Sequence, residues 1–236
     1  MNSPLCNKGS VIIGDPANKN KPIVVVGTAR GGTSMIAGAL AKLGVFMGDE
    51  SVHSVYEDVR LARAFESNNE DEVRAIVNDY NLKSTKWAWK RPSSIDYLGK
   101  VGEALGGPLF IFIFKDILSI AQRNSISMLS EIVPSMRSAL SQYSDCLDFI
   151  EENDLCAMLI SYDKAVADPI FLVNSLVQFY DLDPSEEQIQ SAIEFVRPNP
   201  FDYLDASRIT KAQGFLDGVE NNKIWGWARF VHIRKP

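Results

Sequence analysis

The chain has 236 residues, of which 46% are hydrophobic and 23% charged, enough for one large domain with a full hydrophobic core. Its 30 acidic and 24 basic side chains give a formal net charge of −6, which excludes a broadly basic surface for nucleic acid or an anionic membrane. The three cysteines, Cys6, Cys146 and Cys156, are an odd number without metal-ligand spacing and indicate reduced thiols in a cytoplasmic protein. Two histidines, His53 and His232, are too few for a His-rich zinc site, and we expect no metal.

The first 21 residues form a polar lead-in without the apolar core of a secretory signal. Within this lead-in, Val11–Ile13 supports at most a short strand. The longest apolar stretch of the chain, residues 109–114, is far shorter than the roughly 20 residues that a membrane-spanning helix needs. We therefore expect no membrane segment.

The first firm element is a strand at residues 23–26, four β-branched residues that suit a position buried on both faces of a parallel sheet. Apolar residues between Met35 and Leu43 then recur at helical spacing until Gly44. Further strands are predicted at 87–90, 109–114 and 155–160. Further helices are predicted at 57–66, 71–80, 116–129, 134–152, 169–180 and 185–195. This alternation predicts an α/β fold with a parallel β-sheet flanked by helices.

The tail has a different pattern. Two apolar clusters at 214–218 and 224–227, joined by polar residues 219–223, predict a β-hairpin. One interpretation is a terminal hairpin that covers the core. The other is the beginning of a small β-sandwich module, because the stretch resembles the opening of a module that follows some carbohydrate-modifying enzymes. We therefore expect a lead-in over 1–21, an α/β domain over 22–210, and a hairpin or truncated β module over 211–236.

The most informative motif is the loop between Gly27 and Ser34, which has the glycine spacing of a P-loop but carries Thr33 in place of its lysine. A strand, a glycine loop and a helix N-terminus together direct backbone N–H groups and a positive dipole end at an anion. Without the lysine, hydrolysis of a nucleoside triphosphate is disfavoured, and the loop suits one terminal 5′-phosphate or phosphosulfate. The alternative is ordinary α/β packing without a ligand. The candidate ligand-binding residues of the loop are Ala29, Arg30, Gly31, Gly32, Thr33 and Ser34.

This loop resembles the 5′-phosphosulfate-binding loop of sulfotransferases, which runs Pro, Lys or Arg, Ser, Gly, Thr, then Thr or Ser. Arg30 matches its basic position, while Ala29 and Gly31 replace its Pro and Ser. The remaining positions are matched by Gly32, Thr33 and Ser34. The resemblance extends roughly over residues 21–205. It implies a P-loop-like fold and the donor 3′-phosphoadenosine 5′-phosphosulfate, used without a metal.

A second sulfotransferase signature holds the 3′-phosphate of the donor with an arginine at a strand end and a serine eight residues later. Here Lys115 takes the arginine position, Arg123 the eighth position, and Ser125 lies two residues further on. Lys115 keeps the charge but lacks the bidentate fork of arginine, which Arg123 could restore. The resemblance therefore assigns Lys115 and Arg123 to the 3′-phosphate. The alternative is a solvated strand end and helix face.

The acceptor side needs a general base. Glu57 falls in an aromatic-Glu-Asp triplet that in many bacterial sulfotransferases opens the helix after the loop, and His53, with a reference pKa near neutrality, is the other candidate. Otherwise Glu57 is a first-turn carboxylate and His53 a loop residue. Lys90 precedes a proline-containing turn, where the resemblance implies a sulfate or acceptor contact, and core packing is favoured for the neighbouring Trp87 and Trp89. The candidate catalytic residues are Arg30, Glu57, His53 and Lys90.

Together these features predict transfer of a sulfuryl group from 3′-phosphoadenosine 5′-phosphosulfate to a hydroxyl or amine of a small-molecule or saccharide acceptor. One alternative is a P-loop phosphotransferase or kinase, which Thr33 disfavours. Another is a catalytically degenerate binding module with the same fold, which the altered 3′-phosphate motif keeps open. We expect no nucleic acid and no membrane as partners.

Overall fold

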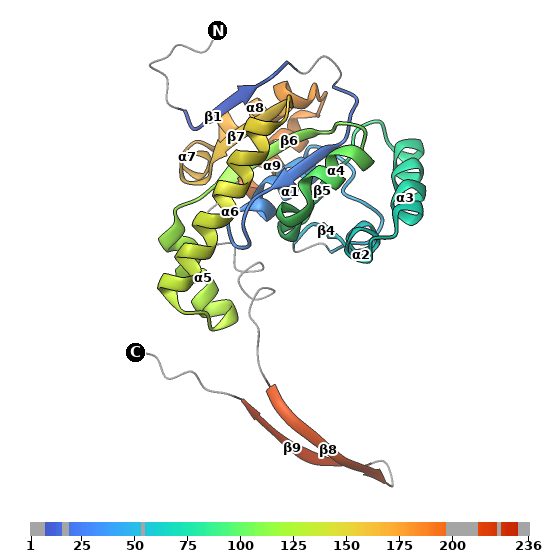
Figure 1. Cartoon of the computed structure of the whole chain (residues 1–236), viewed down its shortest axis with the longest axis vertical. Helices are drawn as coiled ribbons and strands as arrows, with labels where there is room; N and C mark the ends of the chain where they lie inside the picture. Colours follow the sequence, from blue (N-terminus) through green and yellow to red (C-terminus); the bar gives the residue numbers. More distant parts are fainter. Residues whose placement is uncertain (1–7, 16–18, 53–54, 197–211, 221–222, 231–236) are drawn as a thin grey trace.

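The computed structural model describes residues 8–15, 19–52, 55–196, 212–220 and 223–230, the last two ranges as backbone only (Figure 1). The strands are β1 (Ser10–Ile13), β2 (Ile23–Val26), β3 (Ser51–Val52), β4 (Glu57–Asp58), β5 (Ala88–Lys90), β6 (Leu109–Phe114), β7 (Ala157–Ser161), β8 (Ala212–Glu220) and β9 (Lys223–Phe230). The helices are α1 (Thr33–Lys42), α2 (Val59–Glu66), α3 (Glu70–Lys83), the 3-10 helix η1 (Pro92–Tyr97), α4 (Leu98–Ala104), α5 (Ile117–Met128), α6 (Ile132–Glu152), α7 (Tyr162–Ala167), α8 (Pro169–Tyr180) and α9 (Glu186–Phe195).

The central sheet has the strand order β1-β7-β6-β2-β5, and β1 alone among these strands runs antiparallel to its neighbour. Strand β2 lies in the interior, where Ile23 pairs with Leu109 of β6 and Ala88 of β5. All four side chains of β2 are fully buried, which explains its unbroken β-branched sequence. The predicted parallel sheet with flanking helices is confirmed.

Two hydrophobic layers cover the faces of this sheet. Successive side chains of a strand point to opposite faces, so Ile23 and Val25 join one core cluster and Val24 and Val26 the other. Helices α1, α8 and α9 contribute to the first cluster, and α2, α3, α4 and α6 contribute to the second. Figure 1 shows α6 in front of the sheet and α1 behind it.

The two tryptophans before the proline turn belong to the core. Trp87 and Trp89 are each 1% exposed, and the Trp89 ring stacks on Phe65 with ring centres 5.1 Å apart. Their predicted packing role is confirmed.

The helix predicted at 57–66 begins two residues later than expected. It starts at Val59, because Asp58 is its N-cap and accepts hydrogen bonds from the backbone of Arg60 and Leu61. Glu57 therefore does not lie in a first helical turn. It belongs to β4, which pairs with β3 as a two-stranded ribbon.

The predicted C-terminal hairpin is confirmed as the antiparallel pair β8 and β9, with a register shift between Leu216 and Gly218. Within the described part of the chain, no helix combines the length and the apolar character needed to cross a bilayer.

Candidate functional site

The glycine loop connects the carboxyl end of β2 to the first turn of α1 and closes as a tight turn, in which the Gly31 N–H donates to the Thr28 carbonyl at 2.9 Å. A Cβ atom on Gly31 would lie 2.7 Å from Thr28 Oγ1. Gly32 has φ of 101°, a left-handed conformation that glycine adopts without strain, and a Cβ there would collide with the ring of Tyr162. The loop thus leaves no room for side chains at these two positions.

Arg30 in this loop also has a left-handed backbone, with φ of 67°. A non-glycine residue keeps this conformation only where its surroundings enforce it. Its Nε donates to Ser127 Oγ at 3.2 Å, and that hydroxyl donates to the Arg123 carbonyl at 2.8 Å. Ser127 is 1% exposed, so a buried contact connects the loop to α5.

Lys90 brings a cation to the loop from β5, the strand beside β2. The side chain is 1% exposed, and its Nζ donates to Glu57 Oε1 at 2.6 Å and to Ser34 Oγ at 3.2 Å. Burial lowers the pKa of Lys90 to about 8, with the charges of Arg91 and Arg30 acting in the same direction and Glu57 opposing them. Lys90 therefore carries its proton at neutral pH, beside the helix end where the P-loop lysine is missing.

Glu57 lies between two cations. Its Oε1 accepts from Lys90 and its Oε2 from Arg91 Nη1 at 2.8 Å, while Arg91 also reaches Glu66 at 2.7 Å. Burial alone would raise the pKa of Glu57, but the charges and hydrogen bonds of Lys90 and Arg91 outweigh it and hold that pKa below its ordinary value. The carboxylate is ionised at neutral pH and is a weak base.

Lys115 follows β6, and two hydrogen bonds hold its backbone in place. The Lys115 N–H donates to the Tyr143 hydroxyl at 2.7 Å, and its carbonyl accepts from the same hydroxyl at 2.9 Å. Its Nζ lies 4.3 Å from the centre of the Tyr162 ring. Burial lowers the pKa of Lys115, Asp163 opposes this, and the nearby charge of Arg123 lowers it further. The positive charges of Lys115 and Arg123 therefore act on each other.

The structure brings most of the predicted residues together. Direct contacts join Ser34, Lys90 and Glu57, while Ser127 and Tyr162 connect the loop to the region of Arg123 and Lys115. His53 lies outside the described residues.

Four residues of this site had no predicted role in it. Arg91 directly follows Lys90, and Tyr162 lies two residues after the strand predicted at 155–160, so their position is the available signal. Ser127 and Tyr143 carry no such signal, because only the packing of α5 and α6 brings them to the site.

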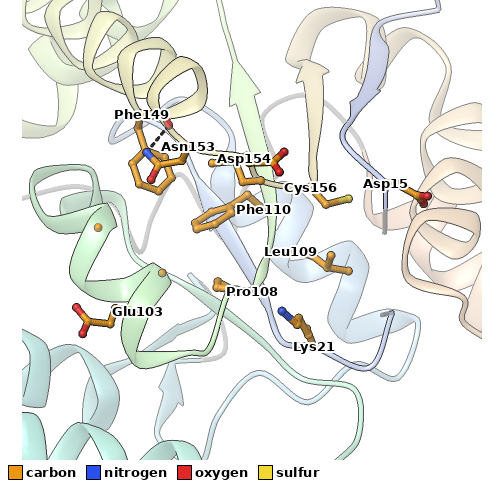
Figure 2. Close-up of a pocket in the computed structure, with 14 residues that line it drawn as sticks. Asp15, Lys21, Glu103, Pro108, Leu109, Phe110, Phe149, Asn153, Asp154 and Cys156 are labelled. Carbon is orange, nitrogen blue, oxygen red and sulfur yellow. Dashed lines mark hydrogen bonds between the residues drawn. The ribbon is translucent and has the colours of Figure 1, made fainter. Parts of the chain in front are cut away.

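A separate cavity of about 520 Å³ lies at the other end of β6 (Figure 2). Its lining includes Leu109 and Phe110 at the amino end of that strand, whereas Lys115 follows the carboxyl end. The charged side chains around it are mostly acidic, since Asp15, Glu103 and Asp154 accompany Lys21. This cavity is therefore not part of the cationic site.

The described residues contain no group of three His, Cys, Asp or Glu side chains placed to hold a metal ion. The loop fits a terminal phosphate or phosphosulfate, because Gly31 and Gly32 allow a tight turn packed against Thr28 and Tyr162 and α1 begins directly behind it. Lys90 contacts Ser34 in the first turn of α1, and the charge of Arg30 in the loop contributes to the lowered pKa of Lys90.

No model of a known protein family matches the chain, and no curated protein matches it. Among solved structures it is similar to the sulfotransferase domain of the olefin synthase from Synechococcus PCC 7002. The identity is 15%, the match covers 78% of this chain and 84% of that one, and the TM-score is 0.53. At this identity the likeness concerns the fold alone. The chain therefore has a P-loop-like α/β fold of the kind found in a sulfotransferase domain.

Proposed function

We propose that this chain transfers a sulfuryl group from 3′-phosphoadenosine 5′-phosphosulfate to a hydroxyl or amine of a small-molecule or saccharide acceptor. The observation that carries the proposal is the contact of buried Lys90 with Ser34, at the start of a P-loop helix that has Thr33 in the lysine position. The sulfotransferase-like fold supports it.

The donor would lie across the carboxyl ends of the central strands. The backbone N–H groups at Gly31–Ser34, together with Arg30, would hold the 5′-phosphosulfate. Lys115 and Arg123 would hold the 3′-phosphate, and the charge effect of one on the other is consistent with a shared anion. Lys115 acts as a point charge, so the directional contacts come from Arg123.

The chemistry requires that the acceptor oxygen bond to sulfur while the bond between sulfur and the 5′-phosphate oxygen breaks. Lys90 and Arg30 would neutralise the charge that develops on the departing phosphate. Glu57, ionised beside Lys90, would accept the proton of the acceptor hydroxyl. Because the pKa of Glu57 is low, this transfer becomes favourable only as the hydroxyl turns acidic during bond formation. His53 remains the other candidate base.

A second candidate is a binding module of the same fold without catalysis. The two ion pairs of Glu57 favour it, because they make the carboxylate a weak base. The phosphotransferase alternative needs a carboxylate after a strand to hold Mg²⁺. Asp116 after β6 has that position, but it caps α5 and accepts from the Ser119 N–H at 2.8 Å.

The direct test measures thermal unfolding with 3′-phosphoadenosine 5′-phosphate and, separately, with ATP and Mg²⁺. A ligand at about one hundred times its Kd stabilises the protein by about 2.7 kcal/mol. We expect this stabilisation with the bisphosphate. A shift with ATP alone would overturn the sulfotransferase proposal, and binding of the bisphosphate without sulfation of any acceptor would favour the binding module.

The role of Lys115 and Arg123 is tested by comparing the bisphosphate with adenosine 5′-monophosphate, which lacks the 3′-phosphate. In Lys115→Ala and Arg123→Ala we expect the advantage of the bisphosphate to shrink while monophosphate binding stays the same. Lys100→Ala, at an exposed lysine on α4, is the matched control. An unchanged advantage in both variants would contradict the assignment.

A further inference from the structure

Helix α6 carries a regular row of exposed apolar side chains. The helix has 21 residues and is about 30 Å long. Ala139 and Cys146 on its inner side are 3% and 1% exposed. A second side presents Val133, Leu140 and Leu147, whose exposed fractions are 62%, 60% and 47%. We call these three residues the α6 stripe.

The spacing of the α6 stripe is the heptad spacing. Its members are seven residues apart, so they lie along one line of the helix. Three residues after each of them come Met136, Tyr143 and Ile150, which are half-buried. Single exposed apolar residues are ordinary on protein surfaces. A heptad continued over a whole helix, with one of its two apolar positions exposed, is typical of a helix that packs against another helix.

The charges beside the α6 stripe are arranged asymmetrically. The flank next to it carries Arg137 in the first half of the helix, and Asp148 and Glu151 in the second half, all exposed. An antiparallel copy of α6 centred on Leu140 would place Arg137 near Asp148 of the second copy. In a parallel copy the charged flanks of the two helices would lie on opposite sides of the interface, so no ion pair would form between them. The flank is therefore complementary to itself in the antiparallel orientation alone.

We propose that the α6 stripe is the two-fold interface of a homodimer, in which α6 packs antiparallel against α6 of a second copy. Such an interface uses the same surface on both subunits. Leu140 meets its own counterpart at the axis, and Val133 meets Leu147 of the second copy on either side. The partner is a second copy of this chain, because both the apolar row and its charged flank are complementary to an antiparallel copy of themselves. Tyr143, which holds the backbone of Lys115, lies three residues after Leu140 in the half-buried row beside the α6 stripe, so the dimer would also brace the end of β6.

The first experiment measures the mass of the full chain in solution by sedimentation at several protein concentrations. We expect a dimer for the native chain and a monomer for Leu140→Glu, because two carboxylates would meet at the axis. Leu82→Glu, at a position 89% exposed on α3, is the matched control and should stay dimeric. Circular dichroism and thermal unfolding check that each variant is folded. A native chain that is monomeric throughout, or a Leu140→Glu variant that stays dimeric, would overturn the proposal.

A second experiment tests the antiparallel orientation with charge exchange. Arg137→Glu should weaken dimerisation about tenfold, since two symmetric surface ion pairs are lost. Combining it with Asp148→Arg should restore the native dissociation constant, because each pair is rebuilt with reversed signs. In addition, Leu140→Cys should form a disulfide-linked dimer on mild oxidation, and Leu82→Cys should not. If the double variant is weaker than Arg137→Glu alone, or Leu140→Cys does not cross-link, the antiparallel dimer is refuted.

Discussion

Lys90 combines an unfavourable free energy of burial with a position suited to binding an anion. A buried ammonium is unfavourable unless it is paired, and even a paired one seldom stabilises a fold more than apolar packing would. Its neighbours Glu57 and Ser34 supply that pairing. A cation held at this cost beside a helix N-terminus makes more sense for binding an anion than for stability.

The pH dependence of binding follows from this lysine. Its pKa of about 8 means that the charged form dominates at lower pH and is lost as the pH rises. We therefore expect the affinity for 3′-phosphoadenosine 5′-phosphate to fall as the pH increases through about 8. Bound anion favours the charged form, so the loss in the complex should occur at higher pH than in the free protein. Calorimetric titrations on both sides of this pH measure the effect.

Two variants isolate Lys90 as the cause. Lys90→Arg stays charged at all these pH values and should remove the decline, while Lys90→Met should bind weakly throughout. Burial lowers the pKa of Lys115 as well. A decline that persists in Lys90→Arg would assign the effect to that second lysine or to another group.

At the scale of elements, the sequence predicts those helices and strands that leave a pattern in consecutive residues. Strand β2 and helix α1 were recognisable because burial on both faces and a helical repeat each leave a signature in consecutive residues. The ribbon β3–β4 and the helix α7 are too short to leave one. The sequence predicts the start of α2 two residues too early, because Asp58 is equally suited to a first turn and to an N-cap.

In the candidate site, too, some features can be predicted from the sequence and others cannot. The glycines of the loop could be recognised from spacing, since close packing against Thr28 and Tyr162 requires them. The contact between Lys90 and Ser34 could not, because it depends on β5 lying beside β2 in the sheet. Strand order is a property of the assembled sheet and not of either segment.

The loop prediction concerns Gly32. In Gly32→Ala the new methyl group would meet the Tyr162 ring and the backbone would be held at φ of 101°. We expect a loss of stability of about 1–3 kcal/mol and weaker binding of the bisphosphate. Urea unfolding and calorimetry measure the two effects.

Gly99→Ala is the matched control for that variant. Gly99 lies in α4, and a Cβ there meets nothing within 4 Å. The substitution should increase stability by about 0.5–1 kcal/mol and leave binding unchanged. Native stability and native affinity in Gly32→Ala would show that the loop tolerates a side chain, and the proposed cradle would then be wrong.

On the scale of the whole molecule, a net charge of −6 coexists with a local cluster of cations. No short segment is strongly basic, because the cations come from the loop, the end of β5, the end of β6 and α5. Only the parallel sheet, which places these carboxyl ends along one edge, brings them together. The residues concerned are Arg30, Lys90, Arg91, Lys115 and Arg123.

The edge strand of the same sheet, next to β7, is formed by residues that precede the predicted domain. Strand β1 runs antiparallel to β7, with Val11 opposite Leu159, and the Ser161 N–H donates to the Gly9 carbonyl at 2.7 Å. Without β1 the polar backbone edge of β7 would be exposed, although Met158 within it is fully buried. Uncovered edges of this kind promote association with other chains.

A chain that lacks residues 1–14 should therefore be less stable than one that lacks only residues 1–7 and keeps β1. At a net value of about 1 kcal/mol for each backbone hydrogen bond, we expect the longer truncation to lower the free energy of unfolding by about 2–4 kcal/mol. Urea unfolding compares the two chains, and light scattering detects the association of the exposed edge. Equal stability and equal solubility would mean that the folded unit begins after β1, near Lys21, and that the antiparallel pairing contributes little to it.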